Sequence, residues 1–449
     1  MAKRDPEKSM QKSAAPLAGA PARRPWWIPF FLGSVPDIGP HALMMLGTVG
    51  FAVFFEGYDL ALLTSALSFI ADDLGMAEES LGGWTGLIRL GGLPAVLLLP
   101  FADRIGRRRV FLASLIGLSV ATLLTAFSPT VEAFVAMQMI ARVSYITFSA
   151  TAVVIIAEEL PAEHRGWGLG IFGALAALGW GSSAILFSFI EVLPGGWRFL
   201  YLVGAVPLLF FPMFRRNIRE TRRFETGRQE RLASGDAATG LHGWIQPIHD
   251  LATTYPRRMI GVTLACFLFA AGELAVMQFV GYFVLEERGW EPWQFSTMVI
   301  LTGSVGLAGN VYAGRLGDRF GRRPIGLITM TLVPVGAVLF FHANDAVLPA
   351  AWIILSLGTI ASNLVLRALV TESFPTNQRS TAAGWMTLLG TLGAAAGLWA
   401  VALGRNAGME LTTIISLVSL LASVAGFCLF LLPETSGREL EEISSAHPS

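Results

Sequence analysis

Charged residues are scarce in this sequence: they make up 14% of its 449 residues, whereas 53% are hydrophobic. Soluble domains carry about 25% charged residues, so a soluble protein of this size would lack the polar groups that cover a surface. The formal net charge is zero, which argues against nucleic acid as a partner. Two cysteines and six scattered histidines are too few for a disulfide framework or a metal-ligand cluster.

Two kinds of functional motif are also missing. The phosphate-binding pattern Gly-x-x-x-x-Gly-Lys-Ser/Thr does not occur, which disfavours an ATP-driven pump. No arrangement of nucleophile, base and orienting acid stands out, so we do not expect an enzyme. We expect no metal and no cofactor, apart from protons as a coupling ion.

Long apolar runs are abundant, and the mean hydropathy is +0.59. A bilayer core of about 30 Å requires about 20 helical residues. Twelve runs have roughly this length, at 41–70, 82–102, 109–128, 131–157, 166–190, 197–214, 258–284, 296–316, 324–342, 347–371, 380–402 and 409–432. The sequence therefore predicts an all-α polytopic membrane protein of twelve transmembrane helices.

Basic residues are distributed unevenly between the two sets of loops. If the N-terminus is cytoplasmic, 26 of the 32 Lys and Arg residues lie on that side, and only Arg198, Arg288 and Arg405 lie on the other. Because cytoplasmic loops are rich in Lys and Arg, we expect both termini in the cytoplasm and the protein in the cell (inner or plasma) membrane. Residues 1–40 are expected to form a largely disordered cytoplasmic arm without a signal peptide, and 433–449 a cytoplasmic tail.

Three motifs occur twice. They are Asp-Arg-x-Gly-Arg-Arg at 103–108 and 318–323, Glu-x-x-Pro-x-x-x-Arg at 158–165 and 372–379, and Glu-Thr at 220–221 and 434–435. The offset is 215 residues for the first pair and 214 for the other two. This regularity predicts two similar six-helix halves, 41–216 and 258–432, joined by a charged cytoplasmic linker at 217–257.

The pattern resembles the major facilitator superfamily over nearly the whole chain. The resemblance rests on the two Asp-Arg-x-Gly-Arg-Arg loops, Gly-Tyr-Asp at 57–59, Gly-Trp-Arg at 196–198 and Pro-Glu-Thr-Ser-Gly at 433–437, which are similar to those of sugar porters and metabolite:proton symporters. Residues 56–61 also resemble the first helix of aromatic acid:proton symporters, with Glu56 in place of Asp. Pro100 and Ala102 depart from the usual glycines of the first loop. The resemblance implies two bundles related by a pseudo-twofold axis, alternating access around a site between them, and a monomer.

The repeated spacing of the cytoplasmic charges suggests two interpretations. The family resemblance implies an inter-half latch, in which carboxylates pair with arginines of neighbouring helices while the protein faces outward, and release them as the cytoplasmic side opens. The alternative is that the arginines only set membrane orientation. The residues of the proposed latch are Asp103, Arg107, Arg108, Glu158, Arg165, Glu220, Asp318, Arg322, Arg323, Glu372, Arg379 and Glu434.

Six ionisable residues stand out inside the predicted spans, where such groups are usually functional. They are Glu56, Asp59, Arg89, Arg142, Glu273 and Arg367. At about 1.5 Å per residue, Asp59 and Arg142 lie at a similar depth, about 15 Å from the outer edge, and we expect them to pair. Asp59 is then the best candidate for a proton carrier, although a purely structural salt bridge fits as well. Glu56 and Glu273, the counterpart of Asp59 in the second half, could carry protons, meet a cationic substrate or form structural pairs.

The remaining candidates concern substrate binding. Arg89 could attract an anion or extend towards the membrane surface, and Arg367 could hold a substrate carboxylate or pair with Glu372. Polar side chains that could complete a site are Gln138, Tyr145, Gln278, Asn310 and Asn363. The alternative for each of these is a role in helix packing.

Secondary active transport of a small organic solute is the function that best fits these features. Three intramembrane arginines favour proton-coupled symport of an organic carboxylate, aromatic carboxylates included. A sugar or polyol, an organic cation or zwitterion, drug export, and a non-transporting solute sensor remain as alternatives. The partners that we expect are the small-molecule substrate, protons and membrane lipid.

Overall fold

The protein is described by a computed structural model that covers residues 25, 27–28, 35–96, 98, 105–221, 224–225, 242–375 and 378–436. For residues 162, 242–245, 247 and 304–314 only the backbone is described. All regular structure within these ranges is helical. Most of the predicted arm at 1–40, Asp103 and most of the predicted tail lie outside the described residues.

The helices of the first half follow the predicted spans closely. They are α1 (Gly39–Ser65), α2 (Leu67–Leu74), α3 (Glu78–Leu90), α5 (Arg107–Thr125), α6 (Val131–Glu159), α7 (Arg165–Phe187), α8 (Trp197–Gly204) and α9 (Phe211–Asn217). The predicted span 41–70 is interrupted, because α1 ends at Ser65 and α2 begins at Leu67. The span 197–214 is broken between α8 and α9, where Pro207 and Pro212 lack the amide hydrogens that a continuous helix needs.

The second half repeats this order. The linker contributes α11 (His242–Thr254). The helices of the second half are α12 (Pro256–Tyr282, followed by a π-helical turn at Phe283–Glu287), α13 (Pro292–Phe320), α14 (Arg322–His342), α15 (Leu348–Glu372), α16 (Arg379–Asn406) and α17 (Leu411–Cys428). Within the described ranges, ten helical segments are long and apolar enough to cross a membrane. The predicted span 82–102 falls on α3, and the residues that follow this helix are only partly described. The predicted span 296–316 falls on α13, a 29-residue helix.

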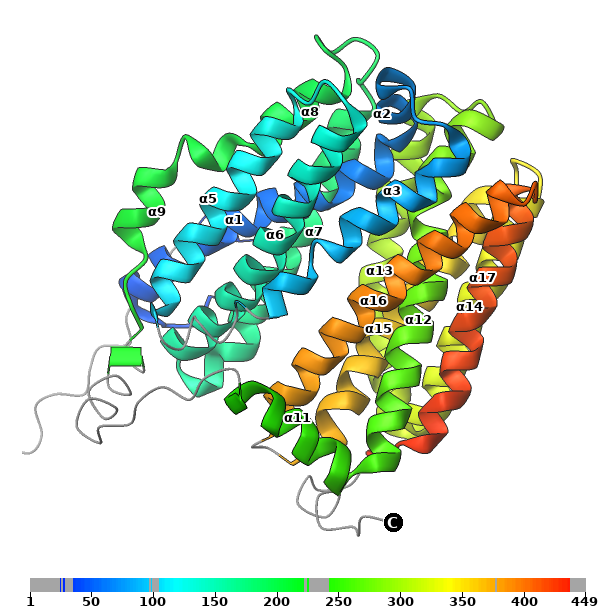
Figure 1. Cartoon of the computed structure of the whole chain (residues 1–449). Coiled ribbons are helices and arrows are strands. Elements are labelled where there is room, and N and C mark those ends of the chain that lie inside the picture. Colours follow the sequence, from blue (N-terminus) through cyan, green and yellow to red (C-terminus); the bar gives the residue numbers. More distant parts are fainter. Residues whose placement is uncertain are drawn as a thin grey trace, which may run out of the picture.

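The two halves form separate bundles that lie side by side (Figure 1). Glycines bring helices of one bundle into direct backbone contact. A Cβ on Gly57 would overlap the carbonyl oxygen of Ala176 on α7, and a Cβ on Gly397 would overlap that of Ala271 on α12. Small residues allow this close approach between membrane helices, and these two crossings occupy equivalent places in the two halves.

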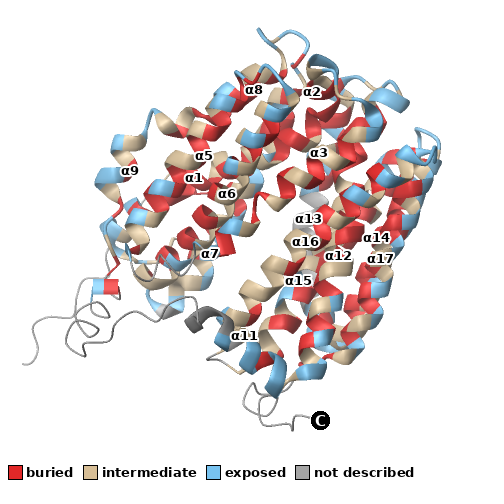
Figure 2. Cartoon of the chain, in the orientation of Figure 1, coloured by how far each residue is buried: buried red, intermediate tan, exposed pale blue. Residues whose placement is uncertain are grey.

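Large apolar side chains are exposed on the outer faces of both bundles. Leu301 on α13, Leu403 on α16 and Phe427 on α17 have 66%, 71% and 64% of their surface exposed. Figure 2 shows buried positions along the middle of the helices, and exposed positions at the loops and helix ends. Extensive apolar surface of this kind needs a partner other than water, and helices of this length and hydropathy find it in lipid. The protein is an integral membrane protein.

The halves meet at one end of the molecule, which we call the closed end, where α3 packs against α16 and α2 contacts α12. Glu78 on α3 pairs with Arg405 on α16, and the indole nitrogen of Trp399 donates to the carbonyl oxygen of Gly83 at 3.2 Å. At the opposite end, called the linker end because α11 lies there, the ribbons of the two halves diverge (Figure 1).

Candidate functional site

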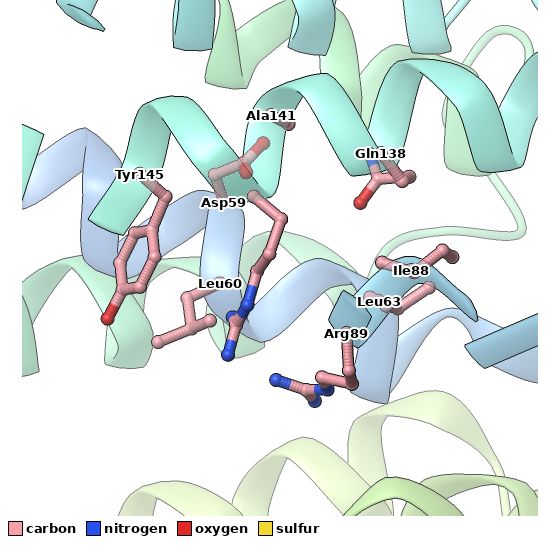
Figure 3. Close-up of a pocket in the computed structure, with 9 residues that line it drawn as sticks. Asp59, Leu60, Leu63, Ile88, Arg89, Gln138, Ala141 and Tyr145 are labelled. Atoms are coloured by element: carbon pink, nitrogen blue, oxygen red, sulfur yellow. The ribbon is translucent and has the colours of Figure 1, made fainter. Parts of the chain in front are cut away.

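A pocket lies among α1, α3 and α6, close to the interface between the halves (Figure 3). The cavity is small, with a volume of about 30 Å³. Its lining residues are Asp59, Leu60, Leu63, Ile88, Arg89, Gln138, Ala141, Arg142 and Tyr145. The structure thus places five predicted functional residues, from three helices, around one space, with an apolar wall opposite the charged groups.

Asp59 is not in direct contact with Arg142, contrary to the predicted ion pair. Its Oδ1 accepts a hydrogen bond from the hydroxyl of Thr122 on α5, at 2.9 Å, and no oxygen of Asp59 lies within 4.0 Å of the guanidinium nitrogens of Arg142. The two charges are nevertheless close enough to attract each other. Both residues line the same pocket, but the predicted ion pair is not formed in this conformation.

Arg142 lies over the ring of Tyr145, with 5.1 Å between the guanidinium carbon and the ring centroid. Its Nε is buried and has no hydrogen-bond partner. A guanidinium that lines a pocket without a carboxylate partner is a suitable group to bind an anion. The aromatic ring of Tyr145 keeps the guanidinium in this place through a cation–π contact.

Arg89 links the two halves. Its Nη2 donates to Oε1 of Gln278 on α12 at 2.9 Å, and the amide of Gln278 donates in turn to the carbonyl oxygen of Leu63 at 3.4 Å. Gln278 is completely buried. Both were predicted to bind substrate, and in this conformation they bind each other, while the buried Nε of Arg89 has no hydrogen-bond partner.

Glu273 occupies the centre of the second half. It is buried, its carboxylate interacts with the side chain of Asn363, and it is attracted by Arg89 and Arg367. Arg367 is exposed, and it is close enough to Tyr145 of the first half to act on it electrostatically. The alternative of an Arg367–Glu372 pair is wrong for this conformation, because Glu372 binds Arg322.

Three further candidates differ in their surroundings. Glu56 is buried outside the pocket, interacts with Ser149, and leaves Oε2 without a partner. Gln138 lines the pocket but donates to the hydroxyl of Thr125 at 3.1 Å. Asn310 lies where only the backbone is described. Thr122 was missed, because threonines in apolar spans usually bond to their own helix and nothing in the sequence sets this one apart.

At the linker end, equivalent charged pairs occur in the two halves. Arg107 pairs with Glu158 at 3.3 Å, and Arg322 pairs with Glu372 at 2.8 Å. The exposed Asp318 lies 3.3 Å from Arg322, one turn away on α13 and α14. Each of these pairs joins helices of one half.

Two carboxylates bind backbone amides at the same end. Glu220 accepts from the backbone N–H of Arg108 at 3.1 Å, and Glu434 accepts from those of Arg322 and Arg323 at 2.8 and 3.1 Å. Arg165 and Arg379 also bind the backbone in equivalent ways in the two halves. The Nε of Arg165 donates to the carbonyl oxygen of Leu160, and that of Arg379 donates to the carbonyl oxygen of Phe374. Every ion pair between two described residues at this end stays within one half, so the predicted inter-half latch is not formed among them in this conformation.

The backbone geometry explains why Glu434 remains charged. Burial acts to raise the pKa of Glu434, but hydrogen bonds from the backbone N–H groups of Arg322, Arg323, Ser436 and Thr435 lower it, and the pKa lies below its ordinary value. Gly321 precedes the first of these amides with φ of +99°, which favours glycine and turns the amides towards the carboxylate.

These features define a polytopic membrane transporter of two bundles, with a charged pocket in the first bundle close to the interface. The chain belongs to the major facilitator superfamily, because the sequence model of this family matches residues 49–398 and 262–448. It is 25% identical to a niacin transporter of Acinetobacter baylyi, over 90% of this chain and 97% of that protein. It is also 25% identical to a gentisate transporter of Corynebacterium glutamicum, over 77% of each chain. The xylose transporter of E. coli in an inward open conformation has the same fold, with a TM-score of 0.70 and 21% identity over 89% of this chain and 98% of that one.

Proposed function

We propose that this transporter is a proton-coupled symporter of a small organic carboxylate, and that its substrates include aromatic carboxylates. The observation that carries the proposal is the guanidinium of Arg142, which lines the pocket and has no carboxylate partner. The apolar residues Leu60, Leu63 and Ile88 line the same pocket, and the ring of a substrate could pack against them. Niacin and gentisate, named for two similar transporters, are both ring carboxylic acids.

In this proposal the arginines have separate roles. Arg142 holds the substrate carboxylate in the first half, and Tyr145 stacks beside it. Arg367, exposed in the second half, meets the carboxylate as it leaves. Arg89 is available only when the closed end opens, since it now binds Gln278.

Proton coupling is assigned to Asp59, with Glu273 as a second acid in the other half. A carboxylate beside an arginine is held in its charged form, while burial favours the neutral form. Asp59 lies in a pocket whose access to water changes as the halves rock, so its protonation can follow the side of exposure.

The conformation corresponds to the inward-facing state if the linker end is cytoplasmic. The excess of Lys and Arg in the linker-end loops supports this orientation, with both termini in the cytoplasm and the protein in the inner or plasma membrane. The likeness to an inward open structure supports the same assignment.

The test is accumulation in proteoliposomes under an imposed proton gradient. Nicotinate and gentisate, a hexose and pentose set, and an organic cation set are compared, with and without a protonophore. We expect carboxylate accumulation that the protonophore abolishes. Asp59→Asn should lose accumulation and keep exchange of internal for external substrate. Accumulation of sugars or cations alone would refute the carboxylate assignment, and normal accumulation by Asp59→Asn would remove Asp59 from the coupling.

A further inference from the structure

Thr122 makes a hydrogen bond that sets it apart from its neighbours. Buried threonines of membrane helices usually donate to the carbonyl oxygen one turn back, as Thr125 does to Ala121 at 2.8 Å and Thr147 does to Val143 at 2.8 Å. Thr122 is 1% exposed, and its hydroxyl instead donates to Asp59 on another helix. Its bond therefore holds a functional side chain, in addition to joining α5 to α1.

The surroundings fix Thr122 in this position. A Cβ on Gly204 would lie 3.0 Å from the methyl group of Thr122 and 3.6 Å from Oδ1 of Asp59, so α8 closely backs the hydrogen bond. Of the two tyrosines near Asp59, Tyr58 donates its hydroxyl to the carbonyl oxygen of Leu200 at 3.0 Å. Tyr201 is completely buried and close to Asp59, but its hydroxyl has no partner.

The bond has a consequence for Arg142. Asp59 has two possible partners, the hydroxyl of Thr122 and the guanidinium of Arg142, and it is found with the hydroxyl. Arg142 then stays above the ring of Tyr145, in the pocket where the substrate would lie. Its buried Nε has no hydrogen-bond partner. A substrate carboxylate and Asp59 would compete for the N–H donors of the same guanidinium, so close binding by Asp59 would weaken binding of the substrate.

We propose that Thr122 is a positioning residue that holds Asp59 away from Arg142, so that Arg142 is free to bind the substrate carboxylate. This inference rests on the proposed carboxylate transport. Without the hydroxyl, Asp59 moves to Arg142 and competes with the substrate. With the hydroxyl, substrate binding and the charge on Asp59 are compatible in the same pocket.

The test compares Thr122→Val, which keeps the shape and removes the hydroxyl, with Thr122→Ser, which keeps the hydroxyl. Equilibrium binding of radiolabelled nicotinate is measured on the purified full-length protein, together with KM and kcat of uptake. Hydrogen bonds to charged groups are strong enough that Thr122→Val should weaken binding by roughly tenfold. Thr122→Ser and the control Tyr201→Phe should bind like the wild type.

The double variant Thr122→Val/Asp59→Asn separates positioning from general damage. The neutral amide that replaces the carboxylate of Asp59 no longer competes for Arg142, so binding of nicotinate should return to near the wild-type value, while accumulation stays lost. Wild-type binding by Thr122→Val, or weak binding that the double variant does not restore, would overturn the role of Thr122 and leave carboxylate transport intact. A wild-type protein that binds no carboxylate would overturn both.

Discussion

Glu78 of the first half and Arg405 of the second form an ion pair that joins α3 to α16 at the closed end. The hydroxyl of Tyr282 donates to the same carboxylate from α12. Exposed pairs contribute about 0.2–1 kcal/mol, so this contact can bias the balance between conformations without fixing it.

Removal of this pair should therefore favour the opposite conformation. We expect Glu78→Gln to raise the labelling rate of a cysteine placed in the path at the closed end by about two- to fivefold. The exchanged pair Glu78→Arg/Arg405→Glu should bring the rate back, and Glu79→Gln, at an exposed neighbour, should not change it. Equal labelling of Glu78→Gln and Glu79→Gln would show that the pair does not hold the closed end.

A side chain at Gly82 should prevent closure altogether. A Cβ there would overlap the carbonyl oxygen of Leu398 and lie 2.9 Å from the amide nitrogen of Ala402, both backbone atoms of α16. Gly82→Leu should stop transport and leave binding from the outer side intact. Gly83 is the matched control, because a Cβ on it meets nothing within 4 Å, so Gly83→Leu should transport normally. Transport by Gly82→Leu would mean that α3 and α16 need not touch during the cycle.

The sequence carried enough information to predict the helices and the level of the site. Asp59 and Arg142 line one pocket, and their similar estimated depths had predicted that they lie near each other, because rise per residue fixes height along a helix. It does not fix side-chain direction, so the bond from Thr122 to Asp59 could not be predicted. The break at Ala66 has no Pro or Gly to mark it.

The repeated motifs show the same limit. The common offset identified Glu158 and Glu372 as equivalent residues, but a repeat cannot tell whether a carboxylate binds within its half or across to the other. The structure shows that both bind within their half. A residue that acts within one half should affect stability more than conformational balance.

The Arg322–Glu372 pair provides that test. Its side chains are only 18% and 23% exposed, and Thr435 also donates to Glu372 at 2.6 Å. We expect Glu372→Gln to lower the stability of the second half by about 1–3 kcal/mol, measured as a lower Tm in detergent. Arg322→Gln/Glu372→Gln should lose less than the sum of the single variants. A change in cysteine labelling at the closed end with unchanged Tm would instead favour the inter-half latch.

Glu434 should give the protein a stability that depends on acid pH. Its pKa is lowered in the folded protein from the ordinary value of 4.5, so the stability that it contributes is present above pH 4.5 and is lost as the pH falls through the lower, folded value. Glu434→Gln should have a lower Tm than the wild type at pH 7, and the difference should shrink below pH 4.5. Glu410→Gln, at an exposed carboxylate, is the control. A difference that does not change with pH would show that charge is not the cause.

Gln278 allows the contact between the halves to be strengthened or weakened at one position. It accepts from Arg89 at 2.9 Å in a site shielded from water, and a carboxylate in its place would form a charge-assisted bond. Gln278→Glu should therefore hold the closed end shut and reduce kcat for uptake by about tenfold, with nicotinate still bound from the open side. Gln278→Asn is too short to reach Arg89 in the same way, and should increase cysteine labelling at the closed end. If both variants shift labelling in the same direction, the Arg89–Gln278 bond does not control opening.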